Sequence, residues 1–313
     1  MSLEGYSTEK LIILARKAPK NLRKSALAAL SVGFFFTNPH YQFFLAYEPS
    51  TGLKHLVISY ESFVAFSTQL SPELQAIFKR AKSQCFVNHT YIMLEDADDH
   101  KQCLKRIKVA NQQVKDALRL AELKEYREKT TALRNQGTHA FLSLDCEMWE
   151  RNHKLIIEVG WSIYDPQTQM VFDRHHIINN AYHLRNGRFV PDNKDNYLFG
   201  ESLVTSITRT GHDLEADIRR FSPVVIVGHD VGGDISALNR CGIKLTDKFG
   251  KLLPTIDTGK LYMDVSSSTH NTTSLGNMCT ALGLRPQKLH NAGNDARYTL
   301  MAFLKMTDPQ REL

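Results

Sequence analysis

Two acidic residues at the end of an apolar run constrain this chain more than any other feature. Residues 140–148 read AFLSLDCEM, a β-prone pattern that predicts a buried strand. Because successive side chains of a strand point to opposite faces, Asp145 and Glu147 are expected on one face and Cys146 on the other. Two carboxylates so close repel each other and require protons or cations, and magnesium takes oxygen ligands of this kind. A solvated strand edge explains a lone Asp-x-Glu pair more simply. The remaining motifs therefore decide between this interpretation and a metal site.

A second acid follows another strand pattern. The β-branched run Val224–Val227 predicts a strand buried on both faces. Gly228 and His229 are expected to end this strand, and Asp234 to open a helix that Gly242 closes. An acid in the first turn also suits the helix dipole without any catalytic role.

A third motif pairs a histidine with an acid. His290 stands at the start of a loop rich in Asn and Gly, and this loop runs into a predicted helix that carries Asp295. A single histidine in such a loop is ordinarily a surface residue. The three motifs are informative as an ordered set.

Together the motifs resemble the DEDDh 3′–5′ exonuclease superfamily, which has a ribonuclease H-like fold. The resemblance covers about residues 138 to 306 and rests on Asp145, Glu147, Asp234, His290 and Asp295. Further segments match in order, namely Ile156–Gly160 as the second strand, Thr255–Thr258 as the Asp-Thr segment, and Thr273–Gly283. Asn291 stands where a related subclass has Tyr, so the histidine branch is the better match.

The resemblance implies hydrolysis of phosphodiester bonds with two Mg²⁺ or Mn²⁺ ions. Metals about 4 Å apart stabilise the attacking and the leaving oxygen together. By similarity, the metal ligands are Asp145, Glu147, Asp234 and Asp295, with Asp145 bridging the ions. His290 is expected to act as the general base on a mobile loop, because histidine accepts a proton near neutral pH.

Three residues are expected to contact the substrate: Met148, Trp149 and Leu275. Family members often use an apolar residue after the acidic pair, so Met148 is expected to wedge beneath the terminal base. Trp149 either stacks on a base or packs in the core. The run Trp149–Arg151 departs from the family pattern, in which small residues are common, and so does Asp230, where Asn is common.

The segment 183–202 looks like a fungal subgroup of DEDDh nuclease-like proteins. Four histidines in and near it invite a metal-site interpretation: His175, His176, His183 and His212. They lack the spacing of a zinc site, so ordinary strand and loop roles are favoured. Arg185 and Arg188 either contact phosphates or belong to a solvated loop.

Length and charge indicate two domains. The chain has 313 residues and a net charge of +6. Residues 1–137 hold 20 Lys and Arg against 13 Asp and Glu, whereas the remainder is near neutral. We expect a small basic α+β domain over 1–100, a charged linker helix over 101–137 and the nuclease-like domain over 138–313. A basic surface favours polyanions, although many proteins that bind none share it.

The first hundred residues predict a small mixed unit. The acid-free stretch 10–36 fits either a mitochondrial presequence or, preferred here, a folded basic helix leading into a strand. Residues 41–47 and 53–59 flank a Pro-Ser-Thr-Gly turn and predict a hairpin. Helices are expected over 61–70 and 73–84.

Residues 101–134 contain no Gly or Pro and predict one long helix. Apolar residues at 3-4 spacing allow a short coiled coil with Asn111 setting the register, and hence a homodimer. The alternative, a single helix packed on its own chain, is preferred because the pattern is short. The five scattered cysteines indicate reduced thiols in an intracellular compartment.

These observations favour a metal-dependent 3′–5′ exonuclease with an α/β ribonuclease H-like mixed sheet. The expected substrate is a single-stranded 3′ end, RNA before DNA, without stable membrane association. The competing class is a non-catalytic scaffold that binds nucleic acid or protein on the same fold. The expected location is the cytoplasm or nucleus, with the mitochondrion as the alternative.

Overall fold

The computed structural model describes the whole chain except residues 1, 32–34, 37, 39, 270–272 and 309–313. The chain divides into two compact units, Met1–Leu118 and Arg119–Leu313. This division lies inside the long helix α5 (Ala97–Asn135), which the sequence had suggested as a segment of its own over 101–137.

The first unit is a closed four-stranded antiparallel barrel with short helices. Its strands are β1 (Ser2–Ser7), β2 (Phe43–Tyr47), β3 (Lys54–Ser59) and β4 (Gln84–Ile92), paired in the order β1-β3-β2-β4. Its helices are α1 (Thr8–Arg16), α2 (Lys20–Ala29), α3 (Tyr60–Thr68), α4 (Pro72–Phe78) and the first part of α5. The hairpin expected over 41–59 is confirmed, with Phe43 opposite Ile58 and Tyr47 opposite Lys54.

Two expectations for this unit were wrong in detail. The single basic helix is split at Pro19, which lies at the N-cap of α2 and cannot continue the helix before it. The strand expected after this helix lies partly among residues that the structure does not describe. The helix expected over 73–84 ends at Phe78, and Gln84 begins β4 instead, because β4 buries alternate side chains such as Phe86 in the barrel.

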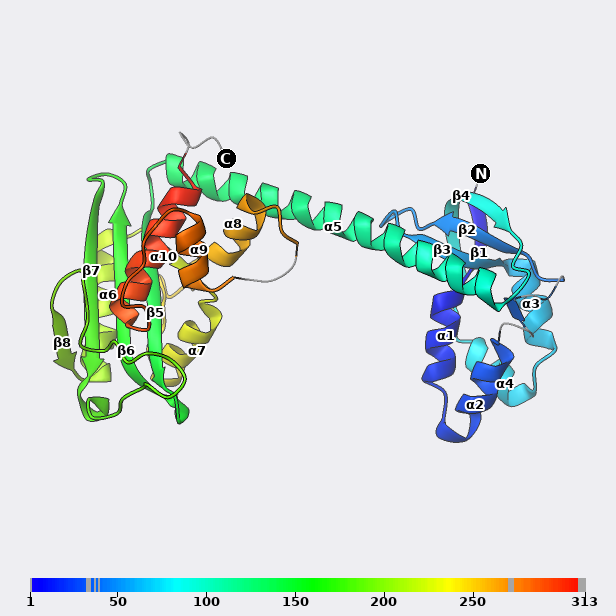
Figure 1. Ribbon diagram of the computed structural model, residues 1–313, viewed down its shortest axis with the longest axis horizontal. Coiled ribbons are helices and arrows are strands. Elements are labelled where there is room, and N and C mark those ends of the chain that lie inside the picture. The colour runs from blue at the N-terminus through cyan, green and yellow to red at the C-terminus, as the bar shows by residue number, and fades with distance from the viewer. Residues whose placement is uncertain (1, 32–34, 37, 39, 270–272, 309–313) are drawn as a thin grey trace. The chain divides into compact units, whose positions relative to one another are not determined.

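The second unit is a six-stranded mixed sheet in the order β10-β9-β5-β6-β7-β8. Figure 1 labels four of these strands, β5 to β8. Its strands are β5 (Ala140–Trp149), β6 (Asn152–Asp165), β7 (Met170–Ile178), β8 (Ser202–Thr205), β9 (Val224–Gly228) and β10 (Thr255–Asp257). Strands β5, β6 and β7 are antiparallel to one another, whereas β9 and β10 run parallel to β5. This arrangement confirms the ribonuclease H-like mixed sheet.

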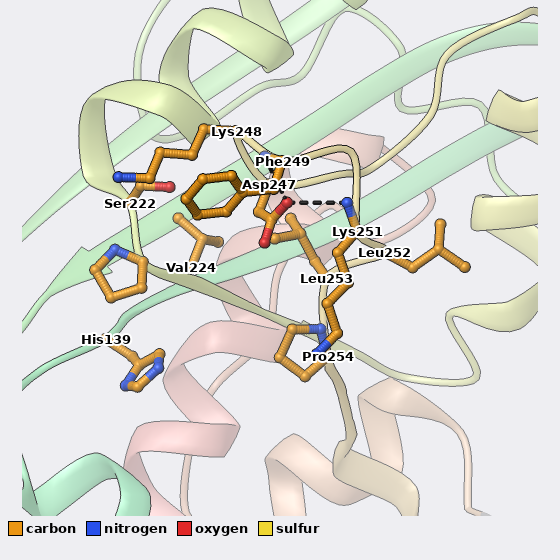
Figure 2. A pocket seen from close by; sticks show the side chains of 11 residues that line it. His139, Ser222, Val224, Asp247, Lys248, Phe249, Lys251, Leu252, Leu253 and Pro254 are labelled. Carbon is orange, nitrogen blue, oxygen red and sulfur yellow. Dashed lines mark hydrogen bonds between the residues drawn. The ribbon is translucent and has the colours of Figure 1, made fainter.

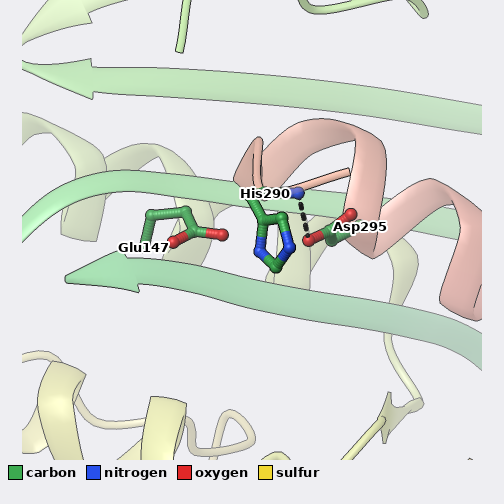
Figure 3. A group of neighbouring side chains, drawn as sticks. All are labelled: Glu147, His290 and Asp295. Atoms are coloured by element: carbon green, nitrogen blue, oxygen red, sulfur yellow. Dashed lines mark hydrogen bonds between the residues drawn. The ribbon is translucent and has the colours of Figure 1, made fainter. Parts of the chain in front are cut away.

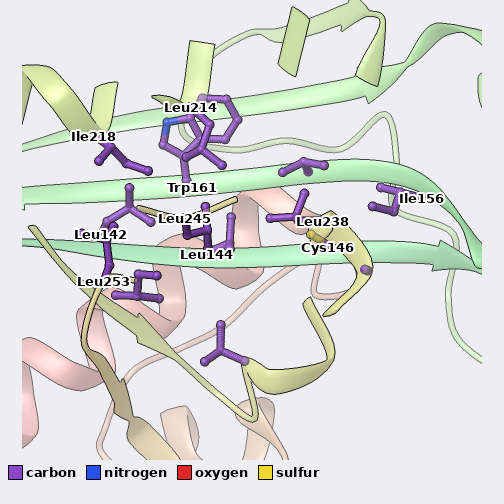
Figure 4. Close-up of a cluster of buried hydrophobic side chains, with 14 of the residues drawn as sticks. Leu142, Leu144, Cys146, Ile156, Trp161, Leu214, Ile218, Leu238, Leu245 and Leu253 are labelled. Carbon is purple, nitrogen blue, oxygen red and sulfur yellow. The ribbon is translucent and has the colours of Figure 1, made fainter. Parts of the chain in front are cut away.

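Helices cover both faces of this sheet. They are α6 (Ile207–Phe221), α7 (Gly232–Arg240), α8 (Thr258–Val265), α9 (Leu275–Ala281) and α10 (Ala292–Met306), with a 3-10 turn at Asn179–Ala181. On one face, Leu142, Leu144 and Trp161 pack against α6 and α7 (Figure 4). On the other face, Phe141 packs against Phe303 of α10. Odd-numbered residues of β5 therefore share the face covered by α10.

Helix α5 packs on its own chain within each unit. In the first unit, the Asn111 side chain donates to the Lys54 carbonyl and accepts from the Lys54 backbone N–H, both at 2.7 Å. In the second unit, Arg127 pairs with Asp264, and Arg134 donates to the Leu304 carbonyl at 2.7 Å. Asn111 is thus occupied within the chain and is not free to set a coiled-coil register.

Candidate active site

Strand β5 presents two acids side by side on the face that α10 covers. Asp145 and Glu147 alternate with Cys146, whose side chain lies in the core cluster on the opposite face. The expected division of these three side chains between the two faces is confirmed. Glu147 also lies directly opposite Glu158 in the ladder between β5 and β6, which brings a third carboxylate to the same face.

Helix α7 brings Asp234 to the end of β5. Strand β9 ends at Gly228, and a Cβ on this residue would lie 2.1 Å from a side-chain atom of Val231, so the turn into α7 requires glycine. Asp234 lies in the first turn of α7, as expected, and its Oδ1 accepts a hydrogen bond from the Cys146 backbone N–H at 3.1 Å. This bond joins Asp234 to β5 at the residue between Asp145 and Glu147.

Helix α10 brings His290 and Asp295 to the same place. His290 has a left-handed φ of 63°, and its backbone N–H donates to Asp295 Oδ2 at 3.0 Å. Asn291 caps the helix by accepting from the Asn294 backbone N–H. The start of α10 lies directly on β6, because a Cβ on Gly160 would come within 2.2 Å of the Ala292 carbonyl oxygen.

The acids share one electrostatic environment. Burial, then repulsion from Asp234, Asp295 and other acids, raises the pKa of Asp145 well above its usual value. Burial and the neighbouring acids raise the pKa of Glu147 to about 8. Burial raises the pKa of Asp234 to about 7 and that of Asp295 to about 7. Cations are needed to hold such a cluster ionised at neutral pH.

The donor set fits divalent metal ions. Among the described residues, one ligand atom from each of Glu147, His290 and Asp295 lies within 4.8 Å of the others, and Figure 3 shows the histidine ring between the two acids. Asp295 Oδ1 is buried and has no hydrogen-bond partner among the described residues, so it retains a free ligand position. Burial lowers the pKa of His290, which keeps its ring neutral. Asp145 and Asp234 lie outside this trio but interact electrostatically with each other.

A buried network behind the acids was missed from the sequence. Glu158 accepts a hydrogen bond from His175 at 2.9 Å and from the Ala292 backbone N–H at 3.4 Å. The other ring nitrogen of His175 bonds Ser202 at 2.8 Å. The expectation that His175 has an ordinary structural role is confirmed. In the sequence, the only sign of this network was the position of Glu158 within the second-strand motif.

The segment 179–201 is fastened to the loop that carries the histidine. The side-chain amide of Asn291 donates to the carbonyls of Asn193 and Lys194, at 3.0 and 3.1 Å. The amide of Asn294 likewise donates to the Asn196 carbonyl at 2.9 Å. Asn residues in a loop suggest turns, so nothing in the sequence predicted that these two would tie distant segments together.

The expected substrate contacts lie in different environments. Met148 is half-buried against the core beneath α6 and α7, so its role as a wedge loses support. Trp149 packs partly against the same core, and Leu275 against the core beneath α10. Arg185 is engaged by Asp192 and Asp195, which favours a structural role over phosphate contact.

A separate hollow lies at the other ends of the central strands. It is lined in part by His139, Pro223, Lys248 and Phe249. Figure 2 shows the side chains of His139, Lys248 and Phe249 around it. His139 precedes β5 and Pro223 precedes β9, whereas the acids lie in the second half of β5 and after the end of β9. The hollow is therefore not part of the carboxylate site.

Comparisons with known proteins agree with this geometry. Residues 140–306 match the DEDDh family model described as DNA polymerase III subunit epsilon-like, C-terminal domain. An uncharacterized nucleolar protein of Schizosaccharomyces pombe is 37% identical over 205 residues, which are 61% of this chain and 81% of that protein. A second relative, from Saccharomyces cerevisiae, is called Good for full DBP5 activity protein 2 and is 34% identical over 216 residues. The match covers 58% of this chain and 38% of the length of that relative.

Solved structures of low identity also match. The RNase domain of the yeast Pop2 protein has a TM-score of 0.36 and 13% identity, covering 60% of this chain and 83% of that one. Cell-death related nuclease 4 has a TM-score of 0.38 and 12% identity, covering 53% of this chain and 62% of that one. At such scores, the fold assignment depends on the strand order and on the family match.

Proposed function

This chain belongs to the DEDDh family, and from that premise we propose that it is a metal-dependent 3′–5′ exonuclease. The observation that carries the proposal is the convergence of four buried or half-buried carboxylates and one histidine from three separate segments. The raised pKa values of Glu147, Asp234 and Asp295 have no structural benefit for an isolated chain, since each buried acid loses its hydration. Such clusters are typical of sites that bind cations or transfer protons.

Two divalent ions, Mg²⁺ or Mn²⁺, would be held by Asp145, Glu147, Asp234 and Asp295. When bound, such ions stabilise negative charge on phosphate oxygens and lower the pKa of water. The chain itself supplies the fixed positions of the ligands. Asp234 is oriented by the Cys146 backbone N–H, and Asp295 by that of His290.

His290 is the proposed general base. Its lowered pKa leaves a nitrogen lone pair free to accept the proton of an attacking water at neutral pH. The bond from its own backbone N–H to Asp295 fixes the backbone beneath the ring. The ring lies close to Glu147 and Asp295, so a proton taken there is held beside negative charge.

The proposed substrate is a single-stranded 3′ end, with RNA preferred over DNA. The site lies where three segments meet, and an unpaired terminal residue enters such a narrow place more readily than a duplex. RNA is placed first by resemblance to the family. The name of the fission yeast relative refers to the nucleolus, which supports the nucleus among the expected compartments. None of the described helices is long and apolar enough to cross a membrane.

Self-association through residues 101–134 remains a separate proposal. Exposed apolar side chains on α5, Leu104, Val109 and Leu118, support it. Asn111 does not contribute, because it is bonded to Lys54. Light scattering of the whole chain distinguishes a dimer from a monomer directly.

The enzyme proposal is tested with single-stranded RNA and DNA labelled at the 5′ end. We expect a ladder of products shortened by one nucleotide at a time with Mg²⁺ or Mn²⁺ and none with EDTA. Asp145→Ala and Glu147→Ala should abolish the ladder, whereas Phe249→Ala, in the separate hollow, should not. If the chain binds oligonucleotides tightly but hydrolyses them with neither Mg²⁺ nor Mn²⁺, the result would instead support the non-catalytic scaffold.

A further inference from the structure

A loop beside the site is fixed in place by one carboxylate. Glu150 accepts hydrogen bonds from the backbone N–H groups of Gly187, Arg188 and Phe189, at 3.2, 3.0 and 3.2 Å. Next to it, the side chain of Asn186 accepts from the Glu150 backbone N–H and donates to the carbonyl of Met148. Residues 186–189 are therefore bound to the chain immediately after the catalytic Glu147.

The continuation of this loop reaches the other side of the site. Asn193 donates to the Leu289 carbonyl at 2.7 Å, and the Leu198 backbone N–H donates to Asn294 at 2.9 Å. The segment 186–198 thus spans from the end of β5 to the loop of His290. The segment therefore lies beside the proposed position of the 3′ end.

Phe189 lies exposed on the fixed part of the loop. Its exposed fraction is 71%, although burial of a Phe side chain is favourable. The Arg188 guanidinium lies 5.1 Å from the centre of its ring. An exposed aromatic ring on a well-bonded loop has a defined position without a packing role, which suits contact with a ligand.

A second pair of the same chemistry stands nearby in the chain. The Arg151 guanidinium lies 5.9 Å from the Trp149 ring, and these residues flank Glu150, which binds the loop of Phe189. The negative charge of Glu150 is directed to three backbone N–H groups. These neighbouring residues supply two guanidinium groups, one exposed ring, Phe189, and one half-buried ring, Trp149, a combination that matches phosphates and bases.

We propose that Phe189 and Arg188, together with Trp149 and Arg151, form a binding subsite for single-stranded nucleic acid outside the metal site. Phe189 stacks on a base upstream of the terminal nucleotide, and the guanidinium groups contact the phosphates that flank this base. The position of the 3′ end in this proposal depends on the exonuclease function proposed above.

Binding is measured by fluorescence anisotropy with labelled single-stranded RNA of ten and of two nucleotides, in the hydrolysis-deficient Asp145→Asn background. A stacked base contributes about 1–3 kcal/mol, so Phe189→Ala should weaken binding of the ten-nucleotide strand by roughly 5- to 150-fold. Phe189→Trp should retain binding, whereas Phe189→Leu should lose it. The dinucleotide, which is too short to reach the subsite, should be unaffected.

Phe249→Ala is the matched control. Phe249 is 82% exposed and has the Lys248 ammonium 5.1 Å from its ring, but it lies in the hollow at the other ends of the strands. Its removal should leave binding unchanged. Arg188→Ala should reduce the salt dependence of binding by about one phosphate contact, a slope change of about 0.7. Melting temperatures check that each variant is folded.

The outcomes separate this subsite from the enzyme proposal. If Phe189→Ala weakens binding but the unmodified chain never hydrolyses RNA or DNA, the proposed subsite is supported and the proposed exonuclease function is overturned. If hydrolysis occurs with the same KM for long strands in Phe189→Ala, the nuclease stands and the subsite is overturned. A ten-nucleotide strand bound equally by Phe189→Ala and Phe249→Ala also overturns the subsite.

Discussion

The backbone N–H of Cys146 donates to the carboxylate of Asp234, which ties helix α7 to strand β5 at 3.1 Å. This bond lies between the two acids of the strand, so Asp145, Glu147 and Asp234 are held together before any ligand binds. Burial and mutual repulsion then raise the pKa values of these acids. The site is preorganised at a cost in stability that bound cations relieve.

Metal ions should stabilise the protein more as the pH rises. An acid whose folded-state pKa is raised keeps its contribution to stability below its ordinary pKa and loses it as the pH rises through the folded value. Glu147 moves from 4.5 to about 8, and Asp295 from 3.8 to about 7, so the loss spans roughly pH 4 to 8. The difference in melting temperature between Mg²⁺ and EDTA should therefore grow from pH 5 to pH 8. A constant difference would contradict the assigned cluster.

Asp145→Asn should stabilise the metal-free protein at pH 8 while abolishing hydrolysis. The amide has the shape of the protonated acid but cannot ionise, so the variant avoids the cost of keeping a buried acid near Asp234 and Asp295 at a pH above its ordinary pKa. The check is a melting curve in EDTA, paired with the RNA ladder assay in Mg²⁺. Asp165→Asn, at the last residue of β6, carries the same change of charge away from the cluster and serves as the control. Equal melting shifts in both variants would speak against the buried cluster as the cause.

His290→Ala should lower kcat by about 10²- to 10⁴-fold, the usual contribution of a general base. KM should change little, because the carboxylates that hold the metals remain. The pH profile gives the sharper test, since the limb that reports deprotonation of His290 should disappear. If kcat is retained, another group takes the proton and His290 loses its assigned role.

Gly160→Ala should destabilise the protein and reduce activity together. The added Cβ would meet the backbone of Ala292 at 2.2 Å and push the start of α10, with Asp295, away from β6. Overpacking of this kind typically costs about 1–3 kcal/mol. Gly232→Ala makes the same change in the first turn of α7, where nothing lies within 4 Å, and should be neutral or stabilising. Thermal melting and kcat of the two variants measured side by side test the contrast.

The strand faces at the site were predictable because they follow from alternation alone. Asp145 and Cys146 must lie on opposite faces of any strand, and the structure has them so. The turn at Gly228 and the helix that begins near Asp234 were predicted because a β-branched run ends at a glycine there. The mixed sheet was implied by the resemblance to the DEDDh superfamily that the ordered motifs carry.

Contacts between distant segments were not predictable. The capture of Gly187, Arg188 and Phe189 by Glu150 joins residues about forty positions apart, and no periodicity encodes such a bond. The end of α4 at Phe78 was also missed, because the polar residues that follow continue a helical pattern, whereas Gln84 pairs with β1 at the start of β4. Tertiary pairing overrides local preference there.

Titration calorimetry with Mn²⁺ at pH 7.5 tests the central claim most directly. The unmodified chain should bind two ions, and Asp145→Asn, which removes one of the proposed metal ligands, should bind fewer and more weakly. A chain that binds no Mn²⁺, even with a nucleoside monophosphate present, or one whose binding is unaffected by Asp145→Asn, would contradict it.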